Sequence, residues 1–187
     1  SLVVEELHRV GIDDVRIDRA GSIIACIGST SGPTLLYDAH MDTVLPASGP
    51  WPYPPYDAVV KDGVLYGRGA CDMKGALAAM TVACESLADV RESLKGELIL
   101  VFVTKEERGN GTRYVLKDKS LSPDFAIVGE ATNMDIVLGQ RYGSLVELTT
   151  RGKSVHFQHY PQQGVDAVTS MMDLLQEIRV MELPSDP

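Results

Sequence analysis

Apolar and polar positions follow two patterns over the first two thirds of the chain, and together these indicate strands separated by helices. Short apolar runs are bounded by turn-forming residues such as Gly21 and the Asp62–Gly63 pair. These runs predict strands at 15–17, 22–27, 34–39, 58–61, 64–67, 97–104 and 124–129. Apolar residues at helical spacing predict helices at 2–10, 73–87 and 112–119, the last capped by Thr112. Alternating strands and helices predict an α/β fold, a layered sheet with helices on both faces.

The pattern changes near Gln140. Residues 144–151 predict a longer, half-polar strand, and residues 165–181 predict an amphipathic helix with Val168, Met172 and Leu175 on one stripe. A single strand and a single helix cannot bury an apolar face between them. This segment therefore either packs on the first domain or begins a second one, and we divide the chain into residues 1–140 and 141–187.

Composition and charge argue against several classes of function. The chain has 187 residues, 17 of them Lys or Arg and 26 Asp or Glu, which gives a formal net charge of −9. An acidic chain of this kind argues against a nucleic-acid or anionic-membrane partner. The apolar runs are too short to span a bilayer, and no secretion signal opens the sequence. Three cysteines without a CxxC pair indicate a reduced, cytoplasmic protein.

Acidic residues and one histidine recur where the predicted strands end. They are His40, Asp42, Asp72, the pair Glu106–Glu107, and Glu130. Ligands for one site come from the carboxyl ends of several strands in an open α/β sheet. A spacing of two puts His40 and Asp42 on one side of an extended chain, where a carboxylate can orient a metal-binding histidine. Asp72 alone would be a helix cap, but its two oxygens also allow it to bridge two cations.

Other catalytic motifs do not fit the sequence. The Gly67–Gly69 segment has Asp72 where a dinucleotide fingerprint needs glycine, and neither a phosphate-binding loop nor a serine nucleophile elbow is present. Cys71 is better explained as a packing residue than as a zinc ligand, because no second cysteine lies near it in the sequence. The acidic clusters therefore remain as the candidate functional residues.

Four segments resemble the ordered motifs of a known zinc superfamily. They are residues 37–44, 67–75, 104–107 and 129–132, and the segment 51–66 is also similar to the family's linking hairpin. The superfamily includes acetylornithine deacetylase, succinyl-diaminopimelate desuccinylase, aminoacylase and glutamate carboxypeptidase. The similarity extends from the first strands to about Ala167. It implies a catalytic domain in residues 1–140 and the beginning of a smaller α+β lid or dimerisation domain in residues 141–187.

The resemblance implies a centre with two zinc ions. His40 and Glu130 would hold one ion, Glu107 would hold the second, and Asp72 would bridge them. Cobalt and manganese also suit a histidine and carboxylate ligand set. Two such cations lower the pKa of a shared water and polarise a carbonyl group.

The resemblance also implies roles for residues that do not bind metal. Glu106 would be the general base that takes a proton from the water and returns it to the leaving amine. Asp42 would orient the metal-binding histidine. Residues 151–156 resemble the opening of the lid, in which His156 would stabilise the oxyanion, usually in the active site of the partner subunit. The alternatives are that His156 is a structural cap, or that His159 has this role.

The implied activity is hydrolysis of the amide bond of an N-acyl amino acid or a short peptide. Residues 129–133 and 139–141 look closer to the deacylase branch than to the dipeptidases. The resemblance implies a homodimer through the lid, and the alternative is a non-catalytic binding or dimerisation module. The family takes its last histidine ligand from a segment that follows the lid. We therefore expect this chain to be an N-terminal piece of a longer enzyme, weak or inactive alone.

Overall fold

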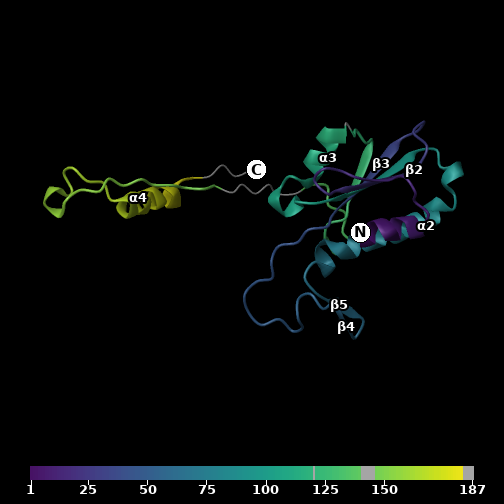
Figure 1. Cartoon of the computed structure of the whole chain (residues 1–187), viewed down its shortest axis with the longest axis horizontal. Coiled ribbons are helices and arrows are strands. Elements are labelled where there is room, and N and C mark those ends of the chain that lie inside the picture. The colour runs from purple at the N-terminus through teal and green to yellow at the C-terminus, as the bar shows by residue number, and fades with distance from the viewer. Residues whose placement is uncertain (120, 140–145, 183–187) are drawn as a thin grey trace. The chain divides into compact units, whose positions relative to one another are not determined.

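The computed structural model describes residues 1–119, 121–139 and 146–182 (Figure 1). The chain divides into two units, Ser1–Val137 and Leu138–Pro187. The first unit contains the main sheet and three helices, and the second contains helix α4 (Ala167–Val180). Among the described residues, each helix falls short of the length and apolarity that crossing a bilayer requires.

Strand β6 (Glu97–Val103) is the centre of a five-stranded sheet with the order β1-β2-β6-β3-β7. On one side it pairs antiparallel with β2 (Ile23–Gly28), which in turn pairs antiparallel with β1 (Val15–Ile17). On the other side it pairs parallel with β3 (Thr34–His40), which pairs parallel with β7 (Phe125–Val128). The strands expected in these regions and the hairpin of the first two are confirmed.

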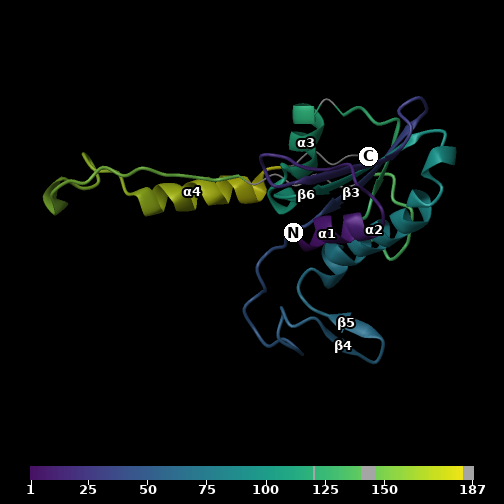
Figure 2. The same cartoon turned by 45° about the vertical axis from the view of Figure 1, so that its right-hand side comes forward.

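Helices cover both faces of this sheet, as the alternating pattern predicts. Helices α1 (Leu2–Arg9) and α2 (Gly75–Ala88) lie on one face and α3 (Gly111–Lys119) on the other (Figure 2). Successive residues of β6 point to opposite faces. One set, Leu98, Leu100 and Phe102, joins the core cluster that contains Leu7, Leu77 and Cys84. The other set, Ile99, Val101 and Val103, packs with Val115 of α3.

A separate hairpin precedes α2. Its strands β4 (Val59–Lys61) and β5 (Val64–Tyr66) pair antiparallel through the turn at Asp62–Gly63. Both turn residues have positive φ, 51° for Asp62 and 78° for Gly63. This is the backbone that a two-residue turn of type I′ requires, so the expectation from the Asp-Gly pair is confirmed.

Two helices begin differently from the prediction. Residues Ala70–Lys74 form an irregular turn before α2, because Asp72 and Met73 have non-helical backbone angles, and the regular helix begins at Gly75. Thr112 does not cap α3. It lies inside the helix, and its hydroxyl donates to Oδ2 of Asp38 over 2.7 Å.

The strand expected at 144–151 is not formed in its described part, residues 146–151; residues 144–145 lie outside the described residues. A strand without a neighbouring strand leaves its backbone groups unpaired. The described residues of the second unit contain instead one antiparallel bridge, between Lys153 and Val165. The helix α4 begins after this bridge because the carboxylate of Asp166 accepts the main-chain N–H groups of Val168 and Thr169.

The central position of β6 leads to a test of stability. Phe102 is fully buried, so Phe102→Ala is expected to lower the free energy of unfolding by about 3–5 kcal/mol. Phe125 in the edge strand β7 is 65% exposed, and Phe125→Ala serves as the matched control with a change within about 0.5 kcal/mol. Urea unfolding of the three proteins measures the difference. Equal losses in the two variants would contradict the assignment of the core to β6.

Candidate metal centre

The candidate site is built around His40. It is the last residue of β3, its side chain is 2% exposed, and its main-chain N–H donates to the sulfur of Met73 over 3.1 Å. Its Nδ1 lies 2.8 Å from the main-chain carbonyl oxygen of Asp42. A carbonyl only accepts hydrogen bonds, so Nδ1 carries a hydrogen and Nε2 is the nitrogen that faces the neighbouring carboxylates.

Strand register brings the other side chains to His40. In the parallel pair of β3 and β6, His40 lies opposite Val103, so the Glu106–Glu107 pair follows at the same end of the sheet. In the pair of β3 and β7, Asp38 lies opposite Val128. Glu130 therefore follows its strand at the level of His40. The carboxyl ends of three neighbouring strands supply the site.

Carboxylate oxygens surround Nε2 of His40. Oδ1 of Asp72 lies 2.9 Å from it and Oε1 of Glu130 lies 3.9 Å from it. Two groups of three side chains bring their possible ligand atoms within 4.8 Å of one another: His40 with Asp72 and Glu107, and His40 with Glu106 and Glu130. The structure thus brings together five of the residues that the sequence singles out, and the histidine belongs to both groups.

Local backbone geometry positions the two glutamates. Lys105 has φ 63°, in the left-handed region that non-glycine residues rarely adopt, and it turns the chain out of β6 into one short 3₁₀ turn, Glu106–Arg108. The main-chain N–H of Glu106 donates to Oδ1 of Asp42 over 3.2 Å. The Oε1 atom of Glu107 accepts the N–H of Val44 over 3.2 Å. These contacts tie the turn to the segment that follows His40.

Asp42 orients the ring of His40 through its main-chain carbonyl group, whereas the sequence predicts that its carboxylate does so. Its carboxylate oxygen Oδ1 lies 3.8 Å from Nδ1 of His40, beyond hydrogen-bond distance. The main-chain carbonyl of Asp42 makes the orienting hydrogen bond, and its carboxylate holds the turn of Glu106. One residue therefore fixes both the histidine ring and the glutamate turn.

Close packing places Asp72 and Glu130. Gly69 has φ 80°, and a Cβ there would lie 2.6 Å from Cγ2 of Thr43, so only glycine allows the turn that leads to Asp72. A Cβ on Gly129, directly before Glu130, would lie 2.9 Å from the methyl carbon of Met73. Met73 thus packs beneath the site and contacts the elements that carry His40 and Glu130.

The electrostatics of the site favour a cation. Burial raises the pKa of Glu130 above its ordinary value, as do the carboxylates of Asp72, Glu106 and Glu107, while His40 opposes the shift. Burial lowers the pKa of His40, but its hydrogen bonds to Asp72 and to the carbonyl of Asp42, with the charges of Glu106 and Glu130, raise it above the ordinary value overall. One imidazole among several carboxylates is a donor set that suits zinc, cobalt or manganese. The residues present therefore fit a divalent metal.

Asp38 is a buried carboxylate behind the site that the sequence analysis passed over. Its Oδ2 accepts the hydroxyl of Thr112, and its Oδ1 has no hydrogen-bond partner among the described residues. Burial raises the pKa of Asp38, and the charge of Glu106 raises it further. The signal in the sequence is an acidic residue within a strand expected to be buried.

His156 lies in the second unit and caps a short turn. Its Nδ1 accepts the main-chain N–H of Gln158 over 3.4 Å, and its ring lies 4.4 Å from that of Phe157 between centroids. The ring of His159 is 6.4 Å away. The groups of metal-ligating side chains found among the described residues do not include His156.

Comparison with known proteins identifies the family that the chain resembles. Residues 36–185 match the peptidase family M20/M25/M40. The succinyl-diaminopimelate desuccinylase of Gluconacetobacter diazotrophicus is 34% identical over 176 residues, which are 88% of this chain and 45% of that protein. The chain thus spans less than half the length of this curated relative.

Two solved structures share the fold of the chain. Human carnosine dipeptidase 1 is 25% identical with a TM-score of 0.56, over 68% of this chain and 31% of that one. An M20 family metallo-carboxypeptidase from Sulfolobus solfataricus is 27% identical with a TM-score of 0.57, over 67% of this chain and 30% of that one.

Because His40 belongs to both donor groups, His40→Ala is expected to abolish tight binding of Zn²⁺ or Co²⁺ in a calorimetric titration. His8 lies on the exposed face of α1, so His8→Ala is the matched control and should leave the stoichiometry and affinity unchanged. Asp72→Asn provides a second test at a partly exposed side chain, where the fold is not at risk, and a loss of affinity of at least about tenfold is expected. Unchanged metal binding in both His40→Ala and Asp72→Asn would contradict the site.

Proposed function

Because the chain belongs to the peptidase family M20/M25/M40, whose members are metal-dependent peptidases and amidohydrolases, we propose that it provides the metal centre of an amide hydrolase. The observation that carries the proposal is the convergence on His40, at the end of β3, of carboxylates from the ends of β6 and β7 and from the turn before α2. In this proposal His40 and Glu130 would hold one zinc ion, Glu107 would hold a second, and Asp72 would be shared by the two. Cobalt or manganese would be held by the same donors.

Bound at these residues, the divalent cations would supply an activated water and a polarised substrate carbonyl. Glu106 is the proposed general base. Its carboxylate lies within 4.8 Å of the ligand atoms of His40 and Glu130, and its main chain is held by Asp42. It takes a proton from the attacking water and delivers it to the leaving amine nitrogen. Glu106 thus has a different role from its neighbour Glu107.

The proposed substrate is an N-acyl amino acid. The similarity to a desuccinylase over 88% of the chain supports this choice. The second candidate is a dipeptidase or carboxypeptidase activity, which the similarity to carnosine dipeptidase 1 and to a metallo-carboxypeptidase supports. Both reactions break an amide bond and use the same centre, so they differ in the group that is recognised beside it.

We further propose that residues 1–140 are the catalytic domain and that residues 141–187 begin a lid through which two copies of the protein form a homodimer. Val168, Met172 and Leu175 of α4 are exposed, and an apolar stripe of this kind is typical of an interface. His156 is the proposed oxyanion donor toward the partner's active site. The free thiols of Cys26, Cys71 and Cys84 support a cytoplasmic location.

The roles of the two glutamates can be separated by matched amide substitutions. Glu106→Gln is expected to retain metal but to reduce release of amine from N-acetyl and N-succinyl amino acids by about 10²–10⁴-fold, because the proton acceptor is lost. Glu107→Gln is expected to lose metal and activity together. Amine release and metal content are measured on the same samples.

Unchanged turnover in Glu106→Gln would contradict the assignment of the base. Loss of metal in Glu106→Gln together with retention of metal in Glu107→Gln would show that Glu106 is the ligand and would contradict the proposed roles. A wild-type protein that is loaded with metal and releases amine only from dipeptides would favour the peptidase candidate. No release from any substrate would fit either a chain that is inactive alone, as the sequence analysis expects, or a binding or dimerisation module.

A further inference from the structure

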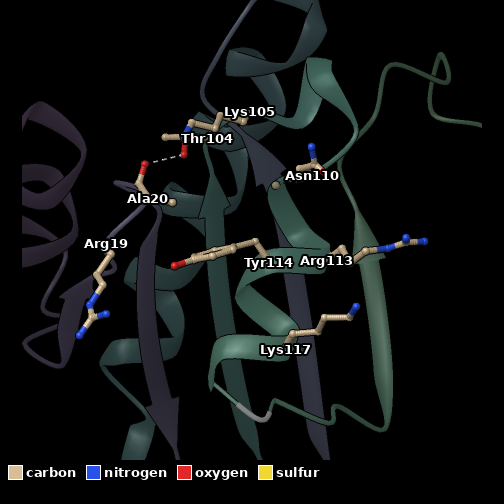
Figure 3. A pocket seen from close by; sticks show the side chains of 9 residues that line it. Arg19, Ala20, Thr104, Lys105, Asn110, Arg113, Tyr114 and Lys117 are labelled. Carbon is tan, nitrogen blue, oxygen red and sulfur yellow. Dashed lines mark hydrogen bonds between the residues drawn. The ribbon is translucent and has the colours of Figure 1, made fainter. Parts of the chain in front are cut away.

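Asp72 differs from the other proposed metal ligands because no strand of the main sheet leads to it. It follows the hairpin of β4 and β5, which is a two-stranded sheet of its own (Figure 1). The turn that carries Glu107, in contrast, is fixed at its start, where the Thr104 hydroxyl donates to the carbonyl oxygen of Ala20 over 2.9 Å (Figure 3). Strand register alone therefore does not set the position of Asp72.

The end of the turn that carries Asp72 is fixed beside β3. The main-chain N–H of Lys74 donates to the carbonyl oxygen of Gly69 over 2.9 Å, and this hydrogen bond spans Asp72. The ammonium group of Lys74 donates to the carbonyl oxygen of Met41 over 2.6 Å, one residue after His40. Because the turn is closed in this way, the carboxylate of Asp72 moves when the beginning of the turn moves.

Arg68 supplies contacts at the beginning of this turn, and it makes them to the proline-rich loop 46–57. Its main-chain N–H donates to the carbonyl oxygen of Pro55 over 2.7 Å. Its guanidinium carbon lies over the ring of Trp51, 5.2 Å from the ring centroid. The indole N–H of Trp51 donates in turn to the carbonyl oxygen of Ala47 over 3.2 Å. The loop thus holds Arg68 by its main chain and by its side chain.

The guanidinium group of Arg68 relies on the tryptophan ring rather than on an acidic partner. Within the described part of the chain, no salt bridge involves Arg68. Its Nε is buried and has no hydrogen-bond partner among the described residues. The face of a tryptophan ring attracts a cation, and the planar guanidinium group is well shaped to lie on it. The contact between Trp51 and Arg68 therefore joins the loop to the turn.

The loop also begins beside the other half of the centre. The main-chain N–H of Val44, just before the loop, donates to Oε1 of Glu107 over 3.2 Å. The neighbouring Thr43 lies so close to Gly69 that a Cβ on this glycine would be 2.6 Å from its methyl carbon. A loop held at both of its ends in this way fixes the distance between the turn of Asp72 and the carboxylate of Glu107.

We propose that the cation–π contact between Trp51 and Arg68 positions Asp72 for metal binding. Trp51 and Arg68 are positioning residues: they hold the turn 67–74 so that the carboxylate of Asp72 faces His40, and they do not touch the metal themselves. This inference rests on the proposed function, because it concerns the same metal centre.

The charge of Arg68 allows positioning to be separated from electrostatics. Arg68→Gln removes a positive charge, which by itself would strengthen the binding of a cation. Loss of positioning instead weakens Zn²⁺ binding in a calorimetric titration of the 187-residue chain, by at least about fivefold for a desolvated contact of this kind. Lys61→Gln is the matched control, because Lys61 lies over the ring of Tyr53 at 5.8 Å in the same hairpin region. Its affinity should stay within about twofold of wild type.

Substitutions of the ring test the same contact from the other side. Trp51→Leu keeps an apolar side chain but removes the aromatic face, so it is expected to weaken Zn²⁺ binding as Arg68→Gln does. Trp51→Phe keeps an aromatic face and should recover most of the affinity. The double variant of Trp51→Leu with Arg68→Gln should bind little more weakly than either single variant, because both substitutions remove one contact. Both side chains are partly exposed, so the core is not disturbed.

Fluorescence gives a readout that does not depend on activity, because Trp51 is the only tryptophan in the sequence. If the contact strengthens metal binding, metal binding must stabilise the contact to the same extent. Quenching of Trp51 emission by acrylamide should therefore decrease when Zn²⁺ is added to the wild type. It should not change on addition of Zn²⁺ to Arg68→Gln.

The outcomes distinguish this inference from the proposed function. A wild type that binds Zn²⁺ while Arg68→Gln and Trp51→Leu bind it equally well would overturn the inference and leave the metal centre in place. Additive losses in the double variant, or equal weakening in Lys61→Gln, would also overturn it. A wild type that binds no Zn²⁺ would contradict the metal centre and this inference with it.

Discussion

The parallel pairing of β3 between β6 and β7 is the constraint on which the candidate site depends. It sets His40 opposite Val103 and brings Glu130 level with His40, although these segments are far apart in the sequence. The alternating residues of β6 hold this register by packing against helices on both faces. A slip of one residue would turn each side chain of a strand to the opposite face and would separate the histidine from its carboxylates.

The same arrangement explains why so few contacts position so many charged groups. The main-chain carbonyl of Asp42 fixes the ring of His40, and its carboxylate holds the turn of Glu106. Met73 packs beneath both His40 and Gly129. The carboxylates of this site are close enough together to raise the pKa of Glu130. A cation bound among them would reduce their mutual repulsion and so lower the free energy of the folded protein. We therefore expect a cation bound here to stabilise the fold at this end of the sheet.

Much of this arrangement was predictable from sequence because strand ends in an α/β sheet converge by topology. Strands, hairpins and the acidic clusters follow from local patterns. The carbonyl partner of His40 was not predictable, since main-chain contacts leave no residue signal. Thr112 was expected to cap α3, but its hydroxyl is used by Asp38, a contact between distant segments.

The central claim is that a divalent metal is held at His40 by carboxylates. X-ray absorption spectroscopy of the zinc-loaded chain tests it most directly, because the first coordination shell distinguishes nitrogen and oxygen from sulfur. The account predicts a first shell of oxygen and nitrogen at about 2.0–2.2 Å, with at most one imidazole per zinc ion. A zinc–sulfur distance of about 2.3 Å, or several imidazoles on one ion, would contradict it, because the zinc would then be bound at other residues.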